Sequence, residues 1–365
     1  MQKNNRTILF ICPYPLGSAP SQRFRFEQYF ELLQSSGFTV ASAPFLNESG
    51  WSILYKDGNF QRKLLFIAKG YCLRLILLLR TIPQADYVFI HREATPLGPP
   101  FMEFLIAKIY RKKIIYDFDD AIWMANTSKE NSFVAGIKWH SKVKSICRWS
   151  HKVSCGNGYL VEFARRYNSS VILNPTTVDT QHVHNPLLHS SKVQSNVITI
   201  GWTGSHSTLH YLKILTPILV TLEKKYPGRI RFLVIADRKP NLGIDALQFV
   251  PWNKEHEIPD LSEIDIGVMP LTDDLWSKGK CGLKALQYMA LGIPTIASSV
   301  GVNKSIIDHQ INGYLCDTPE SWENHLELLI KSVELRKQIG AAGRLKIIQK
   351  FSVMANGSNF LSFFE

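Results

Sequence analysis

The sequence predicts an α/β fold made of two doubly wound domains, each a parallel sheet with helices between its strands. Three observations predict it. The chain has 365 residues, which is more than one hydrophobic core usually holds. Short apolar runs of strand length alternate along it with segments of helical periodicity. This alternation begins at Thr7–Ile11 and begins again at Val197–Ile200, after a polar stretch.

Composition and charge restrict the class of protein. The chain is 45% hydrophobic and 20% charged, which is typical of a globular protein that folds in water. The sequence contains no run of about 18 uncharged apolar residues to cross a bilayer, and its first apolar run is too short for a signal peptide. The six cysteines form no C-x-x-C pair, which favours a reducing compartment. Together these features predict a cytoplasmic protein.

The restart of the strand and helix pattern sets the predicted domain boundaries. Residues 1–180 form the first domain and residues 197–347 form the second. Residues 181–196 are polar and lack periodicity, as expected of a linker. Residues 348–365 end in an apolar segment that needs a surface to cover it, so we expect them to pack back toward the first domain.

The first domain opens with a strand, a loop and a helix. The strand Thr7–Ile11 is followed by a Pro- and Gly-rich loop that contains Gly17 and Ser18, and then by a predicted helix over Gln22–Phe30. In doubly wound folds, ligands bind outside the carboxyl ends of such strands. The loop lacks G-x-G-x-x-G, which argues against a dinucleotide cofactor.

Histidine and aspartate residues follow two neighbouring apolar runs of the first domain. His91 ends one run, and the next run, Ile114–Tyr116, leads into Asp117, Asp119 and Asp120. Carboxylates this close raise one another's pKa, so their position at a strand end indicates a role. They can supply a general base, a metal site or anchors for a hydroxylated substrate, and the alternative is a turn with helix-capping aspartates. His91, Asp119 and Asp120 are the catalytic candidates.

A basic and apolar helix is predicted over residues 61–82. Leu and Ile dominate this segment, Lys and Arg are interspersed, and it contains no Asp or Glu. Residues 1–180 carry 23 Lys and Arg against 13 Asp and Glu, a net charge of +10, whereas the remainder carries 19 against 17. Such a helix in a basic half predicts contact with an anionic membrane surface. The alternative is a buried helix whose Lys and Arg side chains reach solvent at their ends.

The second domain repeats the order of strand, loop and helix. Its first strand, Val197–Ile200, runs into a loop of small residues, Gly201–Thr208, and a helix is predicted over Leu209–Lys225. The next two strands end close to Arg238 and Trp252. These loops and strand ends are where the second domain is expected to hold a ligand.

The stretch Lys278–Pro294 carries the most specific pattern in the chain. It opens with a Gly- and Lys-rich loop, continues with apolar residues at helical spacing, and stops at Gly292 and Pro294. Glycines allow a backbone to approach a ligand closely, and the first turn of a helix directs N–H groups at an anion. The lysines add positive charge, so the loop predicts a phosphate site. The alternative is a solvated loop before an ordinary core helix.

These patterns resemble the GT-B glycosyltransferases, and within them the retaining family four. The resemblance extends over nearly the whole chain, and its most specific part is the block from Lys280 to Gly292 together with Ser299–Gly301 and Asn312–Leu315. The sequence is most similar to the branch found in the synthesis of bacterial envelope polysaccharides. The resemblance implies two Rossmann-like doubly wound domains that face each other across a cleft.

The resemblance also implies an activity. A sugar would pass from a nucleotide-sugar donor to a hydroxyl of a glycan or lipid-linked acceptor, with retained anomeric configuration, no metal and no cofactor apart from the substrate. Lys280, Lys284 and the helix amides near Gly282 would hold the donor's diphosphate and assist its departure. The implied donor-binding residues are Gly17, Ser18, Trp202, Gly204, Ser205, Arg238, Trp252, Lys280, Cys281, Gly282, Lys284 and Gln287.

The second domain departs from the family's pattern. Many members carry a Glu-x7-Glu pair around the helix that follows the lysine loop, where this chain has Gly279 and Gln287. Gln287 can still form a hydrogen bond with a ribose hydroxyl. Many relatives place an Arg and a Lys after the first strand of this domain, where Trp202 and Ser205 stand here. The lysines of the loop and Arg238 are expected to supply the missing phosphate charge.

In the first domain, Asp119 and Asp120 stand where many members of the family have a His, and an Asp there can orient a sugar hydroxyl.

Two other functions remain open. One is a nucleotide-sugar 2-epimerase of the same architecture. The other is a nucleic-acid-binding protein, which the basic first half favours although the sequence contains no recognised nucleic-acid motif. The predicted partners are a nucleotide-sugar, a glycan or lipid-linked acceptor and, through residues 61–82, the inner face of the cell membrane. No nucleic acid is expected.

Overall fold

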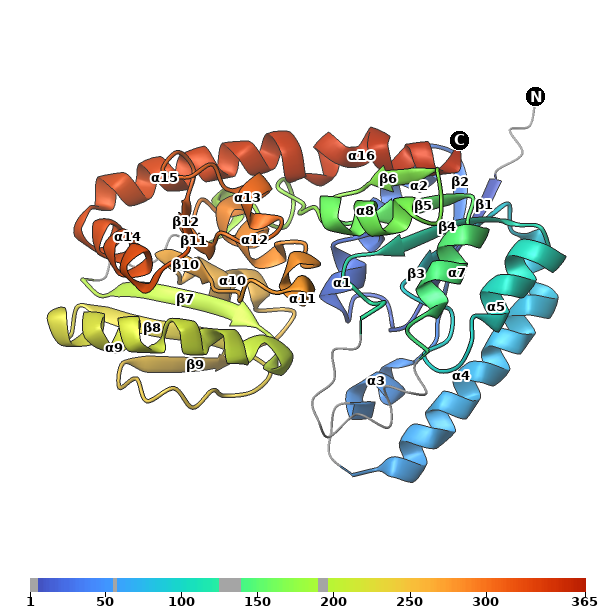
Figure 1. Ribbon diagram of the computed structural model, residues 1–365, viewed down its shortest axis with the longest axis horizontal. Helices are drawn as coiled ribbons and strands as arrows, with labels where there is room; N and C mark the ends of the chain where they lie inside the picture. The colour runs from blue at the N-terminus through green and yellow to red at the C-terminus, as the bar shows by residue number, and fades with distance from the viewer. Residues whose placement is uncertain (1–5, 55–57, 125–138, 190–195) are drawn as a thin grey trace. The chain divides into compact units, whose positions relative to one another are not determined.

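The computed structural model describes residues 6–54, 58–124, 139–189 and 196–365. The chain divides into two compact units, called here unit 1 (residues 1–176 and 357–365) and unit 2 (residues 177–356). Each unit contains a six-stranded parallel sheet with helices between its strands (Figure 1). The predicted α/β fold with two Rossmann-like, doubly wound domains is confirmed.

The sheet of unit 1 has the strand order β2-β1-β3-β4-β5-β6. Its central strands form because their apolar runs are covered on both faces, as parallel sheets require: Ile8, Phe10 and Ile11 of β1 are completely buried. The strands are β1 (Arg6–Cys12), β2 (Phe38–Pro44), β3 (Tyr87–His91), β4 (Lys113–Phe118), β5 (Lys152–Cys155) and β6 (Val171–Leu173).

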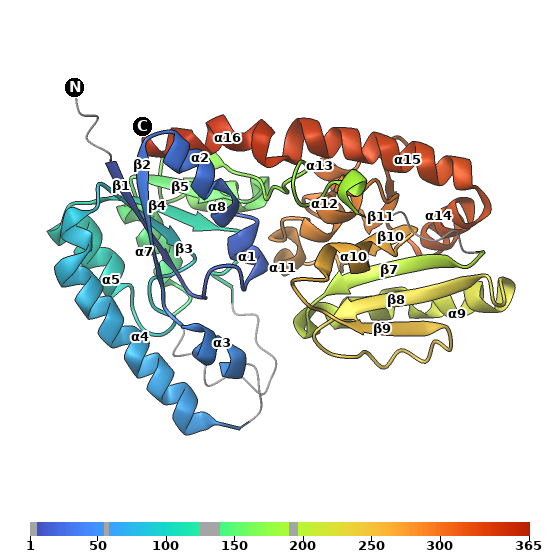
Figure 2. The same ribbon diagram turned by 180° about the vertical axis from the view of Figure 1, so that it is seen from behind.

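Helices connect these strands (Figures 1 and 2). The long helix α4 (Phe60–Arg80) corresponds to the helix that was predicted over residues 61–82. Helix α8 begins after Asn157, whose side chain accepts a hydrogen bond from Leu160 N at 2.9 Å and so caps the helix. The remaining helices and helical turns of unit 1 are α1 (Pro20–Arg23), η1 (Glu27–Tyr29), α2 (Phe30–Ser35), α3 (Glu48–Leu54), η2 (Ile82–Gln84), α5 (Phe101–Phe104), η3 (Leu105–Ile109), α7 (Lys142–Trp149), α8 (Gly158–Arg165) and η8 (Ser362–Phe364).

The predicted helix Gln22–Phe30 is interrupted in the structure. Helix α1 ends at Arg23, and the turn η1 and helix α2 follow it. Phe24, Arg25 and Phe26 are at most 4% exposed. Three successive residues spread over about 200° of a regular helix, so one helical face cannot bury all of them. The interruption of the helix allows all three side chains to be buried, including that of Arg25.

Residues 357–365 complete the core of unit 1. Helix α16 (Val353–Leu361) brings this segment to the unit, and the ring of Phe360 stacks on Tyr29 with 4.2 Å between the ring centroids. Phe360, Phe363 and Phe364 are completely buried. The apolar residues that end the sequence are therefore covered by the N-terminal part of the chain.

The sheet of unit 2 has the strand order β12-β11-β10-β7-β8-β9. From β7 the chain adds β8 and β9 on one side and then β10, β11 and β12 on the other, which is the strand order of the dinucleotide-binding doubly wound fold. The strands are β7 (Ile198–Gly204), β8 (Ile230–Ala236), β9 (Leu247–Pro251), β10 (Ile266–Met269), β11 (Thr295–Ser298) and β12 (Tyr314–Cys316).

The predicted helix Leu209–Lys225 is divided in the structure. Pro217 has no N–H and fits the first turn of a helix, so a new helix, α9 (Thr216–Lys225), begins there after the turn η6 (His206–Ile214). The other helices and helical turns of unit 2 are η5 (Pro186–Leu188), α10 (Glu257–Ser262), α11 (Leu275–Lys278), α12 (Leu283–Ala290), α13 (Asn303–Ile306), α14 (Pro319–Lys331), α15 (Val333–Lys346) and η7 (Ile347–Phe351).

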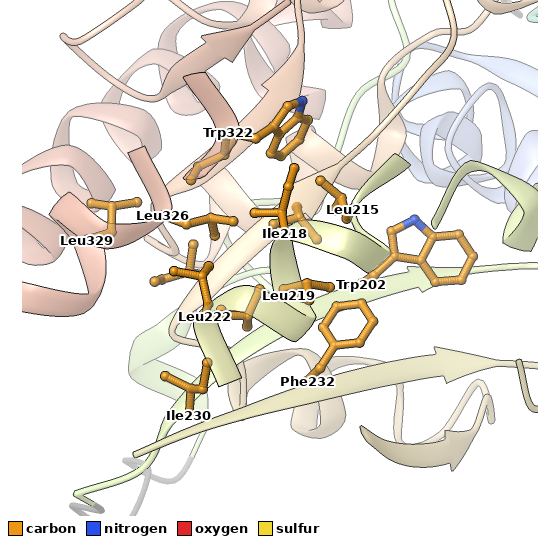
Figure 3. Close-up of a cluster of buried hydrophobic side chains, with 14 of the residues drawn as sticks. Trp202, Leu215, Ile218, Leu219, Leu222, Ile230, Phe232, Trp322, Leu326 and Leu329 are labelled. Atoms are coloured by element: carbon orange, nitrogen blue, oxygen red, sulfur yellow. The ribbon is translucent and has the colours of Figure 1, made fainter. Parts of the chain in front are cut away.

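The main core of unit 2 includes side chains of β7, β8, α9 and α14 (Figure 3). Leu219 and Leu222 of α9, Leu326 of α14 and Phe232 of β8 are at most 2% exposed. Burying one such side chain contributes about 1.5–3 kcal/mol to folding. This apolar packing fixes the strands whose carboxyl ends carry the predicted donor residues.

Part of the predicted linker 181–196 belongs to unit 2. The guanidinium of Arg344 donates hydrogen bonds to the carbonyl oxygens of His184 (2.9 Å) and Thr180 (3.3 Å), and His184 is completely buried. Polar contacts to the backbone hold this stretch, and hydrophobic periodicity does not reveal such contacts. Residues 190–195 lie outside the described residues.

Candidate functional site

Each sheet has a point at which the chain reverses the side on which it adds strands. In unit 1 this switch point lies between β1 and β3, and in unit 2 it lies between β7 and β10. Ligands of doubly wound folds bind outside the carboxyl ends of the strands at such a point, because the two loops that follow diverge there. The loops after β1, β3, β7 and β10 are therefore the positions at which functional side chains are expected.

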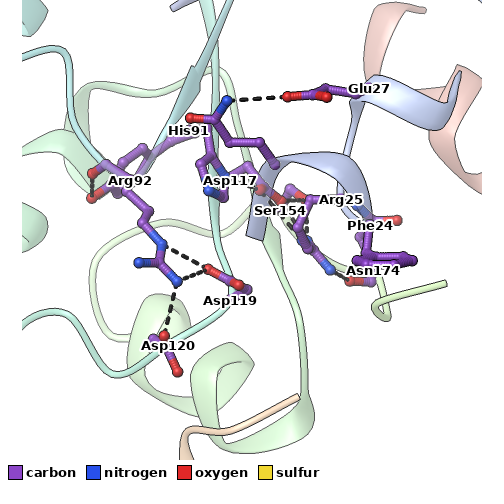
Figure 4. Close-up of polar contacts among 12 residues, drawn as sticks. Phe24, Arg25, Glu27, His91, Arg92, Asp117, Asp119, Asp120, Ser154 and Asn174 are labelled. Atoms are coloured by element: carbon purple, nitrogen blue, oxygen red, sulfur yellow. Dashed lines mark hydrogen bonds and ion pairs between the residues drawn. The ribbon is translucent and has the colours of Figure 1, made fainter. Parts of the chain in front are cut away.

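A buried polar cluster lies at the carboxyl ends of four strands of unit 1 (Figure 4). His91 ends β3, Asp117 lies in β4, Ser154 lies in β5, Asn174 follows β6, and Arg25 comes from the interrupted helical segment. All five residues are at most 1% exposed. Neighbouring parallel strands end at one edge of a sheet, which brings these distant residues together.

Asp117 is the centre of this cluster. It accepts hydrogen bonds from His91 Nδ1 at 2.8 Å and from Ser154 Oγ at 2.5 Å, and it forms an ion pair with the guanidinium of Arg25. Burial raises the pKa of Asp117, but the charge of Arg25 and the contact with His91 outweigh burial and hold the pKa well below its usual range. The carboxyl group is therefore ionised and acts only as an acceptor.

The ionised Asp117 fixes the tautomer of His91. Because a carboxylate only accepts hydrogen bonds, Nδ1 of His91 carries a proton, and the neutral ring then has its lone pair on Nε2. Among the described residues, this buried Nε2 atom has no hydrogen-bond partner. A lone pair in that position can accept a hydrogen bond from a hydroxyl group.

Arg92 joins the other two catalytic candidates. Its Nε donates to Asp119 at 2.8 Å, and one of its terminal nitrogens donates to Asp120 at 2.8 Å. Arg92 has a φ of 61°, a left-handed conformation that costs a residue with a side chain about 1–2 kcal/mol, and Tyr116 donates a hydrogen bond to its carbonyl oxygen at 2.8 Å. Arg92 thus fixes the position of both carboxylates, and a carboxylate held in this way can accept hydrogen bonds from hydroxyl groups.

The loop after β1 contains the two donor candidates of unit 1. Gly17 has a φ of 75°, and its N–H donates to Glu27 at 2.7 Å. The Ser18 N–H donates to the carbonyl oxygen of Pro15 at 3.3 Å, and Gln22 donates to Glu27 at 3.1 Å. These hydrogen bonds give the loop one shape at the switch point of unit 1.

Most donor candidates of unit 2 lie on the two sides of its switch point. Gly204 ends β7 and Ser205 follows it, while Lys280 and Gly282 belong to the loop that leads from α11 into α12. Gly282 has a φ of 72°, and a Cβ atom there would lie 2.2 Å from a side-chain carbon of Ile306, so only glycine fits. The loop therefore carries its backbone close to α13.

Lys280 of the loop and Lys284 in the first turn of α12 each lie over a tryptophan ring. Lys284 Nζ is 5.3 Å from the ring centroid of Trp202, and Lys280 Nζ is 5.0 Å from that of Trp276. The Trp202 side chain is buried in the core of unit 2, and Trp276 is half-buried. A cation over an aromatic ring gains about 0.5–1 kcal/mol at an accessible site. The two rings therefore restrict where the ammonium groups lie.

The remaining donor candidates are less closely grouped. Gln287 is 3% exposed, and its Nε2 lies 3.4 Å from His184 Nε2. Trp252 is half-buried and donates from Nε1 to a glutamate of α10 at 3.4 Å. Arg238 is exposed after β8, and Cys281 is partly buried beside Lys280. Within the described part of the chain, no three His, Cys, Asp or Glu side chains form a group that could hold a metal ion.

The structure brings the predicted residues into two groups. His91, Asp119 and Asp120 share the carboxyl edge of unit 1 with the Gly17 loop, and the lysine loop shares that of unit 2 with Gly204 and Ser205. Four further residues of the site were not predicted from the sequence: Arg25, Arg92, Ser154 and Asn174. A polar residue within one position of the end of every strand from β3 to β6 is the signal that could have revealed Ser154 and Asn174. Arg25 gave no signal, because it lies in a segment that was predicted to be a regular helix.

Part of the chain resembles known proteins in sequence. Residues 235–346 match the model of the family described as glycosyl transferases group 1, and they include the lysine loop. The human alpha-1,3/1,6-mannosyltransferase is 33% identical over 72 residues, which amount to 20% of this chain and 17% of that protein. The match thus spans less than a fifth of the length of this relative.

Solved structures resemble the whole chain. A glycosyltransferase from Rickettsia africae has a TM-score of 0.66 at 16% identity, with 99% of this chain and 98% of that one covered. Sucrose-phosphate synthase from Thermosynechococcus elongatus has a TM-score of 0.66 at 12% identity and the same coverage. Anabaena HepE in complex with UDP and glucose has a TM-score of 0.60 at 13% identity, with 99% of each chain covered. The chain has the GT-B fold. In this GT-B fold the lysine loop lies inside the stretch that matches the family model, and the cluster around Asp117 lies outside it.

Proposed function

We propose that the chain transfers a hexose from a nucleotide-sugar donor to a hydroxyl group of an envelope glycan or a lipid-linked acceptor. The observation that carries this proposal is the pair Lys280 and Lys284 at the start of α12, beside the switch point of unit 2 and within the stretch that matches the glycosyl transferases. HepE, which shares the fold and binds UDP and glucose, supports a nucleoside diphosphate sugar as donor. The family resemblance of the sequence supports retention of configuration and transfer without a metal.

In this proposal unit 2 binds the donor's diphosphate. Helix α12 leaves the N–H groups of its first turn without acceptors inside the helix, and such groups bind phosphate. Lys280 and Lys284 add two positive charges at the same place, and Gly282 allows the loop to pack against Ile306 directly before the helix begins. These groups neutralise the charge that develops on the diphosphate as the bond to the sugar breaks, which lowers the barrier to transfer.

Unit 1 supplies the groups that orient hydroxyls. Asp119 and Asp120, held by Arg92, accept hydrogen bonds from hydroxyl groups of the acceptor or of the donor sugar. Asp117 keeps the proton of His91 on Nδ1, so the buried Nε2 has a lone pair that can accept a hydrogen bond from a hydroxyl group that reaches it. Orientation of the reacting groups is a large part of catalysis when the protein forms no bond to the substrate, and we assign no nucleophile among these residues.

The proposal also assigns a place in the cell. An acceptor that belongs to an envelope glycan or a lipid carrier lies at the cytoplasmic face of the cell membrane. We therefore infer that the chain works as a peripheral protein on that face. The proposed role is one transfer step in the synthesis of an envelope polysaccharide.

Substitution of the lysines tests the donor site. Each charge-assisted hydrogen bond to a phosphate contributes about 1.5–3 kcal/mol, so Lys280→Ala and Lys284→Ala should each weaken nucleotide-sugar binding by roughly 10- to 100-fold. A thermal-shift screen of nucleotide-sugars first identifies the donor, since a ligand of the native state raises Tm. Lys337→Ala, an exposed lysine of α15, is the matched control. Unchanged donor binding in both loop variants would show that the phosphate lies elsewhere.

A reaction without acceptor separates this proposal from its alternatives. A transferase leaves its nucleotide-sugar unchanged in the absence of an acceptor, apart from slow hydrolysis, whereas a nucleotide-sugar 2-epimerase converts it into an isomer. Nuclear magnetic resonance of the nucleotide-sugar distinguishes the two. Tight, salt-sensitive binding of duplex DNA would instead support the nucleic-acid-binding alternative.

A further inference from the structure

Helix α4 is attached to unit 1 along one side. Gly70, Arg74 and Leu78 are buried on that side. The guanidinium of Arg74 donates to the carbonyl oxygens of Cys12 at 3.0 Å, Ala43 at 2.9 Å and Ala94 at 2.7 Å. These acceptors belong to the carboxyl ends of β1 and β2 and to the segment after β3. The helix is thus fixed firmly to the carboxyl edge of the sheet.

The opposite side of α4 is apolar although it faces solvent. The side chains of Leu64 (55%), Leu65 (69%), Leu75 (56%), Ile76 (49%) and Leu79 (74%) are exposed to the extents given. They recur at helical spacing with the exposed small residues 68 and 72 between them, so they form one stripe, called here the apolar stripe. The exposed side of a surface helix is normally polar, so this helix has its apolar surface on the unexpected side.

A second stripe beside the first is basic. Arg62, Lys69 and Arg80 are exposed, and steps of 7 and 11 residues between them bring all three to nearly the same side of a helix with 3.6 residues per turn. No Asp or Glu occurs between residues 58 and 85 to neutralise them. The outer side of α4 therefore pairs an apolar stripe with a positive one.

We propose that the outer side of α4 binds the surface of an anionic lipid bilayer. The apolar stripe would enter the boundary between headgroups and acyl chains, and the basic stripe would contact anionic headgroups in the same plane. Among the described residues, none of the helices combines the length and the apolar character that a bilayer crossing requires, so α4 lies on the membrane. A second copy of the chain fits less well, because two such helices would bring basic stripes together without a carboxylate.

This surface is independent of the proposed transfer reaction but has a consequence for it. Arg74 ties α4 to the carboxyl ends of β1 and β2, the same edge of the sheet that carries His91 and the Asp119–Asp120 pair. A bilayer on the outer side of α4 would therefore lie on the part of unit 1 that also orients hydroxyl groups. Such an arrangement suits an acceptor that is anchored in the lipid.

Vesicle flotation tests the proposal with the full chain. The wild type should bind vesicles that contain phosphatidylglycerol more tightly than vesicles of phosphatidylcholine alone, and salt should weaken this binding. Each basic residue near an anionic surface contributes a factor of about five, so Arg62→Gln, Lys69→Gln and Arg80→Gln combined should lower partitioning on the order of a hundredfold. Leu65→Gln, Ile76→Gln and Leu79→Gln combined should abolish binding to both kinds of vesicle.

Matched variants elsewhere on the chain control for charge and apolarity. Lys224→Gln, Lys254→Gln and Lys337→Gln remove three exposed charges outside α4, and Leu187→Gln, Ile311→Gln and Leu345→Gln remove three exposed apolar side chains. Both triples should bind vesicles as the wild type does. An equal loss of vesicle binding in the control triples and the α4 triples would overturn the proposal. It would also be overturned if the wild type did not bind anionic vesicles but formed dimers, and the apolar triple of α4 made these dimers dissociate. Nucleotide-sugar binding, measured in parallel without vesicles, should stay unchanged in all four triples.

Discussion

Among the described residues of unit 1, Asp117 holds three polar side chains in position. It neutralises Arg25, accepts from Ser154 and fixes the tautomer of His91. Three strands and an interrupted helix thus depend on one carboxylate for the position of their polar side chains. The side chain of a catalytic candidate, His91, is oriented by a residue that the sequence analysis placed only in an acidic motif.

Replacement of Asp117 by Asn should destabilise the protein strongly. The amide keeps the shape of the carboxylate but leaves the buried charge of Arg25 without its partner, and breaking a buried ion pair costs about 3–5 kcal/mol. Urea unfolding measures this loss. Ser154→Ala, which removes one neutral hydroxyl from the same cluster, should cost only about 1 kcal/mol. If the two variants lose equal stability, the charge of Asp117 is not what holds the cluster.

The same carboxylate should make stability depend on acid pH. The folded pKa of Asp117 lies below the unfolded value of about 3.9, so the unfolded chain takes up the proton first as the pH falls. The contribution of Asp117 is therefore complete above about pH 5 and is lost progressively below about pH 4. The free energy of unfolding of the wild type should fall more steeply over this interval than that of Asp117→Asn. Parallel slopes for the two proteins would contradict the lowered pKa.

The sequence could predict some of these residues but not their contacts. His91, Asp119 and Asp120 stand directly after apolar runs, and a parallel sheet brings strand ends together, so their common edge was predictable. The arginine partners at this edge were not predictable. Arg25 reaches Asp117 from an interrupted helix, and Arg92, which holds Asp119 and Asp120, has a left-handed backbone conformation. Local periodicity contains no information about either feature.

At the scale of single elements, helix α12 shows how packing fixes the loop that precedes a helix. Its first residue follows Gly282, whose positive φ and close contact with Ile306 leave no room for a side chain. The pattern of Gly and Lys predicted a helix that starts at this loop, and the structure has α12 there. The interruption in the predicted helix 22–30 was less predictable, since it depends on burial of Arg25, whereas Pro217 within 209–225 was a readable sign of a helix start.

Gly282→Ala should disturb α12 more than a change at a comparable glycine. Alanine would add backbone strain of about 1–2 kcal/mol and a clash with Ile306. Gly228→Ala is the matched control, because Gly228 also has a positive φ but has no atom within 4 Å of the added Cβ. The difference in the free energy of unfolding between the two variants isolates the clash. Nucleotide-sugar binding should weaken in the first variant alone, and equal behaviour of both would argue against a tight loop.

For the whole molecule, the order of units along the chain has a physical consequence. Unit 2 is one continuous stretch, whereas unit 1 needs residues 357–365 to complete its core. The sequence predicted both sheets, because each apolar run has the length of a buried strand. The sequence also predicted that the apolar residues of 348–365 need a surface to cover them, but only the structure identifies Tyr29 as the residue on which Phe360 stacks.

Phe360→Ala should therefore loosen the N-terminal unit although the residue lies near the other end of the sequence. Replacing a buried Phe by Ala costs about 3–5 kcal/mol, and here the cavity would open beside Tyr29. Hydrogen exchange should then accelerate in β1, β3 and α2, while β7 and β8 keep their protection. Leu222→Ala, which opens a cavity in the core of unit 2, should give the reverse pattern. If Phe360→Ala accelerated exchange in both units alike, they would unfold as one cooperative body, and residues 357–365 could not be assigned to the stability of unit 1 alone.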